Sequence, residues 1–198
     1  SQLKIQLEEN RFLNQRLKDM QEYYSYIDNV GEKKTNRLIP AKVLNHSFSL
    51  SSKILTLNVG YNNGVPNKYK AVINYDGNLV GRTYFVSKNT TQVHKINDKN
   101  FHVFVQTKDN KIKGQFTYKN SNRGIIESVS KKFEKQLSIG DTLFTSFSSN
   151  IYAGNIPVAQ IISINNNPLK HELDIAVEIL ADLHTLSNVF IVEWLSLH

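Results

Sequence analysis

The sequence contains no cysteine. This absence excludes a disulfide framework, a thiolate metal site and a cysteine nucleophile. It fits a protein of a reducing cytosol or of a bacterial exterior that uses no disulfides. It argues against a small secreted eukaryotic domain, which usually depends on disulfides for stability.

Long apolar runs are also missing. No stretch approaches the roughly 20 residues that a helix needs to cross a bilayer, and no secretory signal peptide is recognisable. The chain opens at Ser1 already inside a helical pattern. We therefore expect the soluble part of a longer protein, with a membrane anchor upstream.

Glycine is scarce, with only nine residues, whereas asparagine is frequent. Many turns must therefore use asparagine for left-handed backbone positions. Hydrophobic residues make up 40% of the chain and charged residues 21%, which are globular values. Ten Phe and nine Tyr favour strands.

The formal net charge is +7, yet the lysines are scattered and no dense arginine-rich run occurs. A basic balance can indicate nucleic acid, an anionic membrane or acidic partners. The scattered pattern favours a solvated lysine-rich surface instead. Most aromatic residues alternate with polar residues, as core positions do, so we expect no nucleic-acid partner. A nucleic-acid-binding β module is the less favoured alternative.

Residues 1–30 predict one long helix, because good helix formers dominate and no Gly or Pro occurs before Gly31. Apolar and amide residues recur at alternating spacings of three and four, which is the heptad pattern of a coiled coil. An asparagine in such a seam can fix register and strand number. We predict self-association with a second copy through Leu3, Asn10, Leu13, Leu17, Met20, Tyr24 and Ile27, with Gln6 completing the seam.

A second interpretation of this helix stays open. Ile5, Leu7 and Phe12 lie off the seam and widen the apolar face. A single amphipathic helix that lies on its own β body would show the same pattern.

The periodicity changes after a polar segment, residues 31–37, which begins with a helix-ending glycine and predicts a linker. From residue 38 about a dozen short strands follow at spacings of 8–12 residues. Asp76-Gly77 is a strong hairpin signal within them. This pattern predicts a sandwich or barrels, not a parallel sheet.

Catalytic signals are weak. None of the six histidines has the spacing of a zinc motif, and no phosphate-binding glycine loop occurs. Gly140-Asp141-Thr142 resembles the nucleophile context of a chymotrypsin-like serine hydrolase, but the serine is missing and Leu143-Phe144 replaces the oxyanion-hole glycines. We therefore predict no catalytic residues, no metal and no cofactor. A degenerate serine hydrolase is the alternative from another functional class.

Partner-binding anchors are expected among large apolar residues beside turns, where a rigid sheet holds them in place. The candidates are Tyr61, Tyr69, Phe147, Ile151 and Tyr152. The alternative is that these side chains fold back as caps on the ends of the β structure.

Several short strings, in order, resemble one family, the rod shape-determining MreC proteins. One of them, Leu79-Val80-Gly81-Arg82, resembles the family's glycine-leucine-valine-glycine-arginine hairpin. The others are Ile39–Leu44, Leu55–Gly60 with Gly64-Val65, Ile139–Ser146, Ile156–Ala159 and Ala181–Val189. The resemblance covers residues 38–192, and the upstream heptads fit it as well.

This resemblance implies a mainly β fold, with an N-terminal coiled-coil helix followed by two small six-stranded antiparallel β-barrels of protease-like topology without a triad. We expect a helical stalk and linker at 1–37, a first barrel at 38–105 and a second at 106–198. The last strands could instead return to the first barrel.

The resemblance also implies a function and a location. It implies a non-enzymatic scaffold of the cell-elongation machinery that maintains rod shape. Its implied partners are a class B penicillin-binding protein, MreD, MreB and RodA, with self-association into dimers or filaments. It implies the periplasmic face of the bacterial inner membrane, with a single membrane-spanning helix upstream of Ser1.

Overall fold

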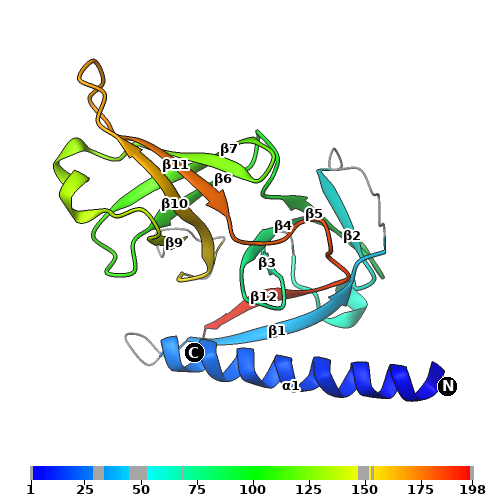
Figure 1. The fold of residues 1–198 in the computed structure, drawn as a ribbon. Coiled ribbons are helices and arrows are strands. Elements are labelled where there is room, and N and C mark those ends of the chain that lie inside the picture. Colours follow the sequence, from blue (N-terminus) through cyan, green and yellow to red (C-terminus); the bar gives the residue numbers. More distant parts are fainter. Residues whose placement is uncertain are drawn as a thin grey trace.

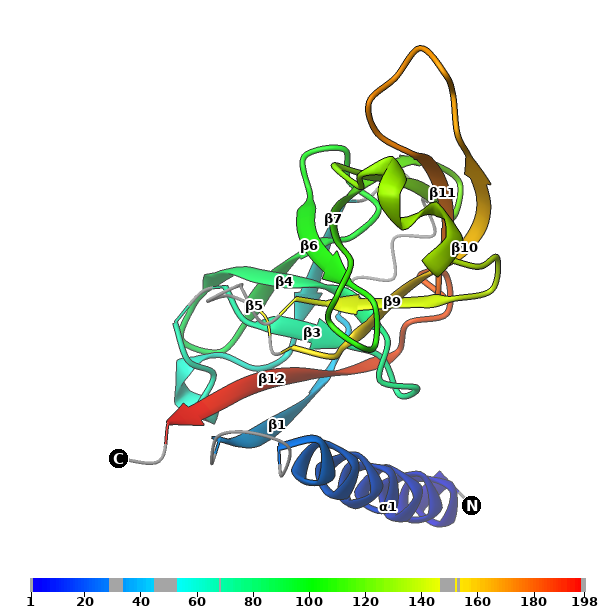
Figure 2. The ribbon, with the colours of Figure 1, turned by 90° about the vertical axis from the view of Figure 1, so that its left-hand side faces the viewer.

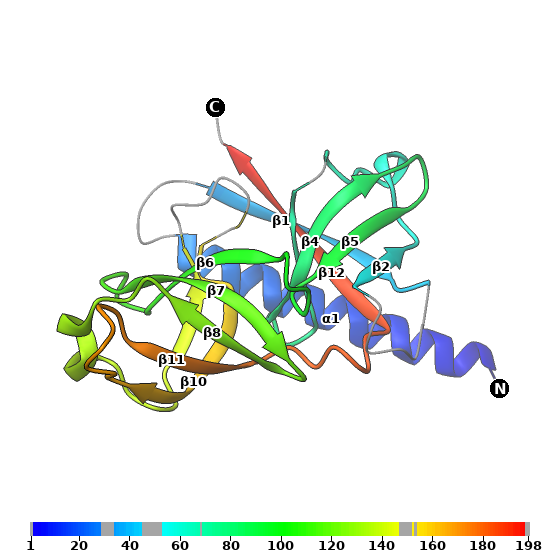
Figure 3. The ribbon, with the colours of Figure 1, turned by 90° about the horizontal axis from the view of Figure 1, so that it is seen from above.

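The computed structural model describes residues 2–28, 34–44, 53–67, 69–146, 152 and 154–196. These parts of the chain are mainly β, with one long helix, α1 (Gln2–Asp28), and two short 3-10 turns, η1 (Tyr61–Asn63) and η2 (Lys131–Gln136). The strands form two units that lie side by side above α1 (Figures 1 and 3).

The first unit is a six-stranded antiparallel sheet, here called the first sheet, with the order β1-β12-β3-β4-β5-β2. Its strands are β1 (Lys34–Lys42), β2 (Ile54–Leu57), β3 (Ala71–Ile73), β4 (Leu79–Val86), β5 (Thr91–Lys95) and β12 (Asn188–Ser196).

We expected this unit to be a closed barrel, but its strands form a sheet that closes only in part. Within the described residues its edge strands, β1 and β2, meet at one bridge, between Val43 and Leu57. A hydrogen bond from Leu44 N–H to Thr56 O, at 2.8 Å, supports that bridge. Asn58 N–H also donates to Lys42 O, at 3.0 Å, so the described contact between the two edges is confined to residues 42–44 and 56–58.

The second unit is a closed six-stranded barrel with the order β10-β11-β8-β7-β6-β9, here called the barrel. Its strands are β6 (His102–Gln106), β7 (Lys113–Asn120), β8 (Arg123–Glu127), β9 (Thr142–Thr145), β10 (Pro157–Asn165) and β11 (Asp174–Ile179).

Strand pairing divides the chain differently from the expected boundaries. A division at residues 105/106 cuts through β6, which belongs to the barrel. The strand β12 pairs with β1 along nine residues, from Lys34 opposite Ser196 to Lys42 opposite Asn188, so the chain returns to the first sheet. Residues 34–37, expected in the linker, are the start of β1, whereas residues 31–33 lie outside the described residues.

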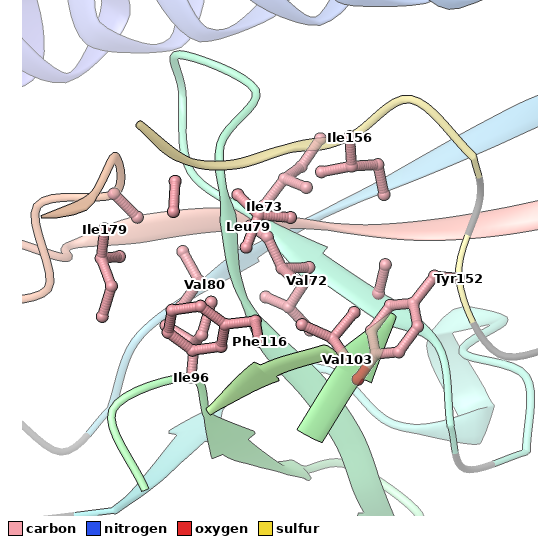
Figure 4. Close-up of a cluster of buried hydrophobic side chains, with 14 of the residues drawn as sticks. Val72, Ile73, Leu79, Val80, Ile96, Val103, Phe116, Tyr152, Ile156 and Ile179 are labelled. Carbon is pink, nitrogen blue, oxygen red and sulfur yellow. The ribbon is translucent and has the colours of Figure 1, made fainter. Parts of the chain in front are cut away.

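One hydrophobic core runs through both units. Figure 4 shows Val72 and Val80 of the first sheet, and Ile96 just after β5, in one buried cluster with Phe116 and Tyr152 of the barrel segment. All five are buried. Because burying one large apolar side chain contributes about 1.5–3 kcal/mol, this shared core couples the folding of the two units.

The helix α1 lies along β1 of its own body (Figures 1 and 2). Leu17 packs against the core and Leu13 is half-buried. The Arg16 guanidinium forms an ion pair with Asp76, at 3.3 Å, in the turn between β3 and β4. Burial raises the pKa of Tyr75 to about 12, and the Glu9 carboxylate of α1 adds to the rise.

These contacts bear on the predicted coiled coil. Leu3 and Asn10 are exposed, whereas Leu13 is half-buried and Leu17 packs against the protein's own core, as the single-helix interpretation expects. The remaining seam residues, Met20, Tyr24 and Ile27, lie in α1, but their side chains are outside the described residues. Pairing between copies stays a prediction.

In the parts of the chain that the structure describes, no helix has both the length and the apolar character needed to cross a membrane.

Because the two units share a core, we expect a destabilising substitution in the barrel to lower the stability of the first sheet as well. Replacing Phe116 with alanine should lower the free energy of unfolding by about 3–5 kcal/mol. Trp194, the single tryptophan, lies in β12 of the first sheet. Thermal unfolding followed by tryptophan fluorescence should therefore shift to lower temperature together with far-UV circular dichroism.

The matched control is Leu169→Ala, because Leu169 is 93% exposed in the barrel segment. This variant should leave both signals unchanged. An early loss of circular dichroism with an unshifted fluorescence transition would show that the two units unfold independently.

Candidate partner-binding surface

A β-bulge near the end of β4 places two aromatic residues on one face. Thr83 pairs with Val93 and Phe85 with Gln92 of β5, so Tyr84 is the extra residue. A bulge sets two residues against one and re-aims their side chains. Tyr84 and Phe85 are both exposed, and the Tyr84 hydroxyl donates to Gln92 Oε1.

A third aromatic residue, Tyr69, lies beside this pair. Its backbone N–H donates to Thr83 O at 2.7 Å, which holds it next to β4. Its φ is +71°, an uncommon value for a bulky residue. The Arg82 guanidinium lies 5.9 Å from the Tyr69 ring centroid, and Tyr69 remains 43% exposed.

Tyr61 extends the exposed aromatic residues beyond the end of β4. It begins η1, and its N–H donates to Ser87 O at 3.0 Å. The preceding Gly60 makes this approach possible, since a Cβ there would lie 2.3 Å from Ser87 O. We call Tyr61, Tyr69, Tyr84 and Phe85 the aromatic surface.

The aromatic surface has the character of a protein-binding site. Exposed aromatic residues held on a rigid sheet lose little conformational freedom on binding, and such residues dominate interface energetics. Tyr84 and Phe85 did not emerge from the sequence, because strict strand alternation assigns neighbours to opposite faces. The sequence signal that could have indicated this site is the presence of two consecutive aromatic residues, Tyr84 and Phe85, in one predicted strand.

Tyr152, one of the predicted anchors, is buried at 4% exposure. Its ring packs edge-on against Phe101, with centroids 6.3 Å apart. Burial raises the pKa of the Tyr152 phenol well above its ordinary value, although the nearby Arg82 cation opposes the rise. In this structure Tyr152 therefore belongs to the core, as the capping interpretation expects. Phe147 and Ile151, the other two anchors of this segment, lie outside the described residues.

Polar contacts reinforce the junction between the two units. The Arg82 guanidinium lies 5.3 Å from the centroid of the Phe101 ring. Lys53 Nζ donates to Asn97 O at 2.6 Å and lies 5.0 Å from the ring centroid of Tyr118 in β7. Cation–π contacts of this kind add about 0.5–2 kcal/mol each.

The connection that leads to β6 is held by Asp98, which lies 3.1 Å from His94 Nε2. Burial alone would raise the pKa of Asp98, but hydrogen bonds from Asn100 N–H and from His94, together with the charge of Lys53, hold it below its ordinary value. The carboxylate therefore stays charged and fixed at the junction.

The segment that resembles a serine-hydrolase motif is a turn in the structure. Asp141 Oδ2 accepts a hydrogen bond from Ser138 N–H at 2.8 Å, and Gly140 has a φ of +94°. Gly140 N–H donates to Ile161 O at 2.8 Å, which anchors the turn to β10. Asp141 thus shapes the entry to β9.

Metal-binding geometry is missing from the part of the chain that the structure describes. There, no three His, Asp or Glu side chains gather closely enough to hold an ion.

Comparison with known proteins identifies the fold. No curated protein matches the chain in sequence. Among solved structures, MreC of Listeria monocytogenes has a TM-score of 0.73 at 15% identity, covering 98% of this chain and 94% of that one. MreC of Pseudomonas aeruginosa has a TM-score of 0.70 at 17% identity, covering 79% of this chain and 99% of that one.

A third similar structure is a complex between the penicillin-binding protein PBP2 and MreC from Helicobacter pylori. It has a TM-score of 0.61 at 17% identity and covers 80% of this chain and 98% of that one. At these identities the structures show a shared fold. In sequence, a family model described as rod shape-determining protein MreC, barrel core, matches residues 43–193. This match spans well over half of the chain, which therefore belongs to the MreC family of rod shape-determining proteins.

Proposed function

We propose that this protein is a non-enzymatic scaffold of the cell-elongation machinery, and that it binds and positions a class B penicillin-binding protein to maintain rod shape. The aromatic surface carries the proposal, because it is the exposed feature best suited to anchor a protein. Family membership and the solved complex of a related MreC with PBP2 support the choice of partner.

The rigid body suits this role. The anchors lie on β4 and the turns beside it, and the shared core fixes that sheet against the barrel. A preformed surface loses little conformational entropy when it binds a partner. By binding one conformation of the synthase more tightly than others, the scaffold shifts the synthase population towards that conformation.

The test of this surface is a double substitution, Tyr84→Ala with Phe85→Ala. Loss of two central aromatic anchors should weaken binding to the extracytoplasmic part of the source bacterium's class B penicillin-binding protein by at least about tenfold, or ~1.4 kcal/mol. Isothermal titration calorimetry gives the affinity, and a melting curve checks that the variant is folded.

Phe104→Ala is the matched control. Phe104 is 56% exposed in β6 of the barrel, against 55% for Phe85 in the first sheet. Full binding by this control, with weakened binding by the double variant, supports the assignment. Equal affinities for all three proteins would remove the aromatic surface from the interface.

The remaining partners and the location follow from the family resemblance. We propose MreD, MreB and RodA as further partners, and the periplasmic side of the inner membrane as the location, with a single membrane-spanning helix upstream in the full-length protein. One structural neighbour is the major periplasmic domain of a cell shape-determining MreC filament, which supports this location.

Self-association into a homodimer or filament is proposed through the seam of α1. Leu17 packs against the core of its own body, and Leu13, on the same side of α1, is half-buried. Pairing along the whole seam therefore requires α1 to leave that body, whereas pairing through the N-terminal turns, at Leu3 and Asn10, does not.

Leu3→Asp tests pairing without disturbing the contact between α1 and the body, since Leu3 is 81% exposed. A buried like-charge pair in the seam is strongly destabilising, so we expect the dimer to dissociate at concentrations where the wild type pairs. Ile5→Asp is the control, because Ile5 is 65% exposed and lies off the seam. Sedimentation equilibrium decides the matter; a monomeric wild type at high concentration would refute pairing.

The alternative of a serine hydrolase has its own test. A fluorophosphonate probe should leave the purified protein unlabelled. Asp141→Asn should keep full affinity for the penicillin-binding protein as long as the protein stays folded. Specific labelling by the probe, lost on heat denaturation, would overturn the scaffold proposal.

A further inference from the structure

The excess of Lys and Arg over Asp and Glu lies in one unit of the protein. Residues 34–101, which form most of the first sheet, contain ten Lys and Arg and only two acidic residues, a formal charge of +8. Since the whole chain has a net charge of +7, everything else sums to −1. Residues 102–187, which include the barrel, contain nine Lys and Arg and eight acidic residues, so the net positive charge of the molecule comes from residues 34–101.

Both carboxylates of residues 34–101 have partners inside the protein. Asp76 forms its ion pair with Arg16 of α1, and Asp98 is held by His94. Asp76 also lies in the turn before β4, whereas Tyr84 and Phe85 lie near that strand's other end. Both acidic residues of this segment are thus engaged by groups of the protein itself.

Several of the cations have internal roles. Lys53 is bound to Asn97 O, and Arg37 pairs with Glu193 at 3.5 Å. Lys95 is buried, and burial, with the charge of Lys53, lowers its pKa. These three groups contribute to the field of the first sheet but are poorly placed to contact a partner.

Two other lysines flank the aromatic surface. Lys70 follows Tyr69 directly, and its backbone pairs with Thr83, the residue before Tyr84. Lys88 is exposed just beyond β4, and its carbonyl accepts a hydrogen bond from Asn62 N–H, next to Tyr61, at 3.1 Å. The backbones of these two lysines thus lie next to the two ends of the aromatic surface.

We infer that the partner face that docks on the aromatic surface is a protein surface with an apolar centre and an acidic rim. This inference rests on the proposed function and adds the chemistry of the partner. Complementary rim charges mainly speed association and exclude partners of the wrong sign, while the apolar centre holds the complex together. Binding should therefore show fast, salt-sensitive association and dissociation that depends on Tyr84 and Phe85.

The experiment compares two double charge reversals that change the net charge equally. Lys70→Glu with Lys88→Glu alters the rim of the aromatic surface, and Lys132→Glu with Lys135→Glu alters exposed positions of η2 in the barrel. Association with the extracytoplasmic part of the class B penicillin-binding protein is followed by surface plasmon resonance at low and high salt.

We expect the rim variant to associate about tenfold more slowly at low salt, with little change in the dissociation rate. The η2 variant should behave like the wild type, and the difference should shrink at high salt as screening increases. Lys88→Glu alone, at an exposed site, should give part of the effect and serves if the double variant is unstable.

The other outcomes count against the inference. Equal slowing in both variants would mean that only net charge matters, and unchanged association in the rim variant would mean that the rim is not acidic. Vesicles of phosphatidylglycerol provide a further arm: their capture by wild type but not by the rim variant, with unchanged protein association, would assign the lysines to a lipid surface. If the wild type fails to bind the synthase at all, the proposed function itself fails.

Discussion

The pairing of β1 with β12 is the interaction on which the rest of the structure depends. It joins segments from near the two ends of the described chain along nine residues of antiparallel ladder. Because β12 follows the barrel in sequence, this ladder turns the whole barrel into an insertion between β5 and β12. Two connections, at 96–101 and 180–187, therefore cross between the units. The ladder also supplies the strand along which α1 lies.

The residues that join the two units are different from the residues of the aromatic surface. The buried core and the contacts of Arg82 and Lys53 hold the first sheet against the barrel. In the proposed function, recognition falls to side chains that contribute little to that core, such as Tyr84 and Phe85. If the aromatic surface binds the partner as proposed, substitutions there should alter partner choice with little loss of stability, whereas substitutions such as Phe116→Ala act through stability.

Much of the architecture could be predicted from local patterns. The heptad spacing located α1, the alternation after residue 38 indicated an antiparallel β body, and ordered short strings identified the family. Long-range details could not be predicted. The burial of Tyr152 depends on Phe101, about fifty positions away, and strict alternation cannot foresee the bulge at Tyr84. The partial closure of the first sheet depends on contacts between residues 42–44 and 56–58, and such long-range contacts leave no trace in local periodicity.

The register of the ladder also determines how the molecule responds to mechanical tension. Lys34 lies opposite Ser196, so the start of β1 and the end of β12 leave the ladder at the same end. Tension between those two points would break the hydrogen bonds of the ladder one after another, in the unzipping geometry. Tension between α1 and the barrel pulls β1 and β12 from opposite ends, and their hydrogen bonds, which run perpendicular to the strands, then share the force. The β1–β12 ladder should accordingly resist more force along the line that joins the helix to the barrel than between its own two free ends.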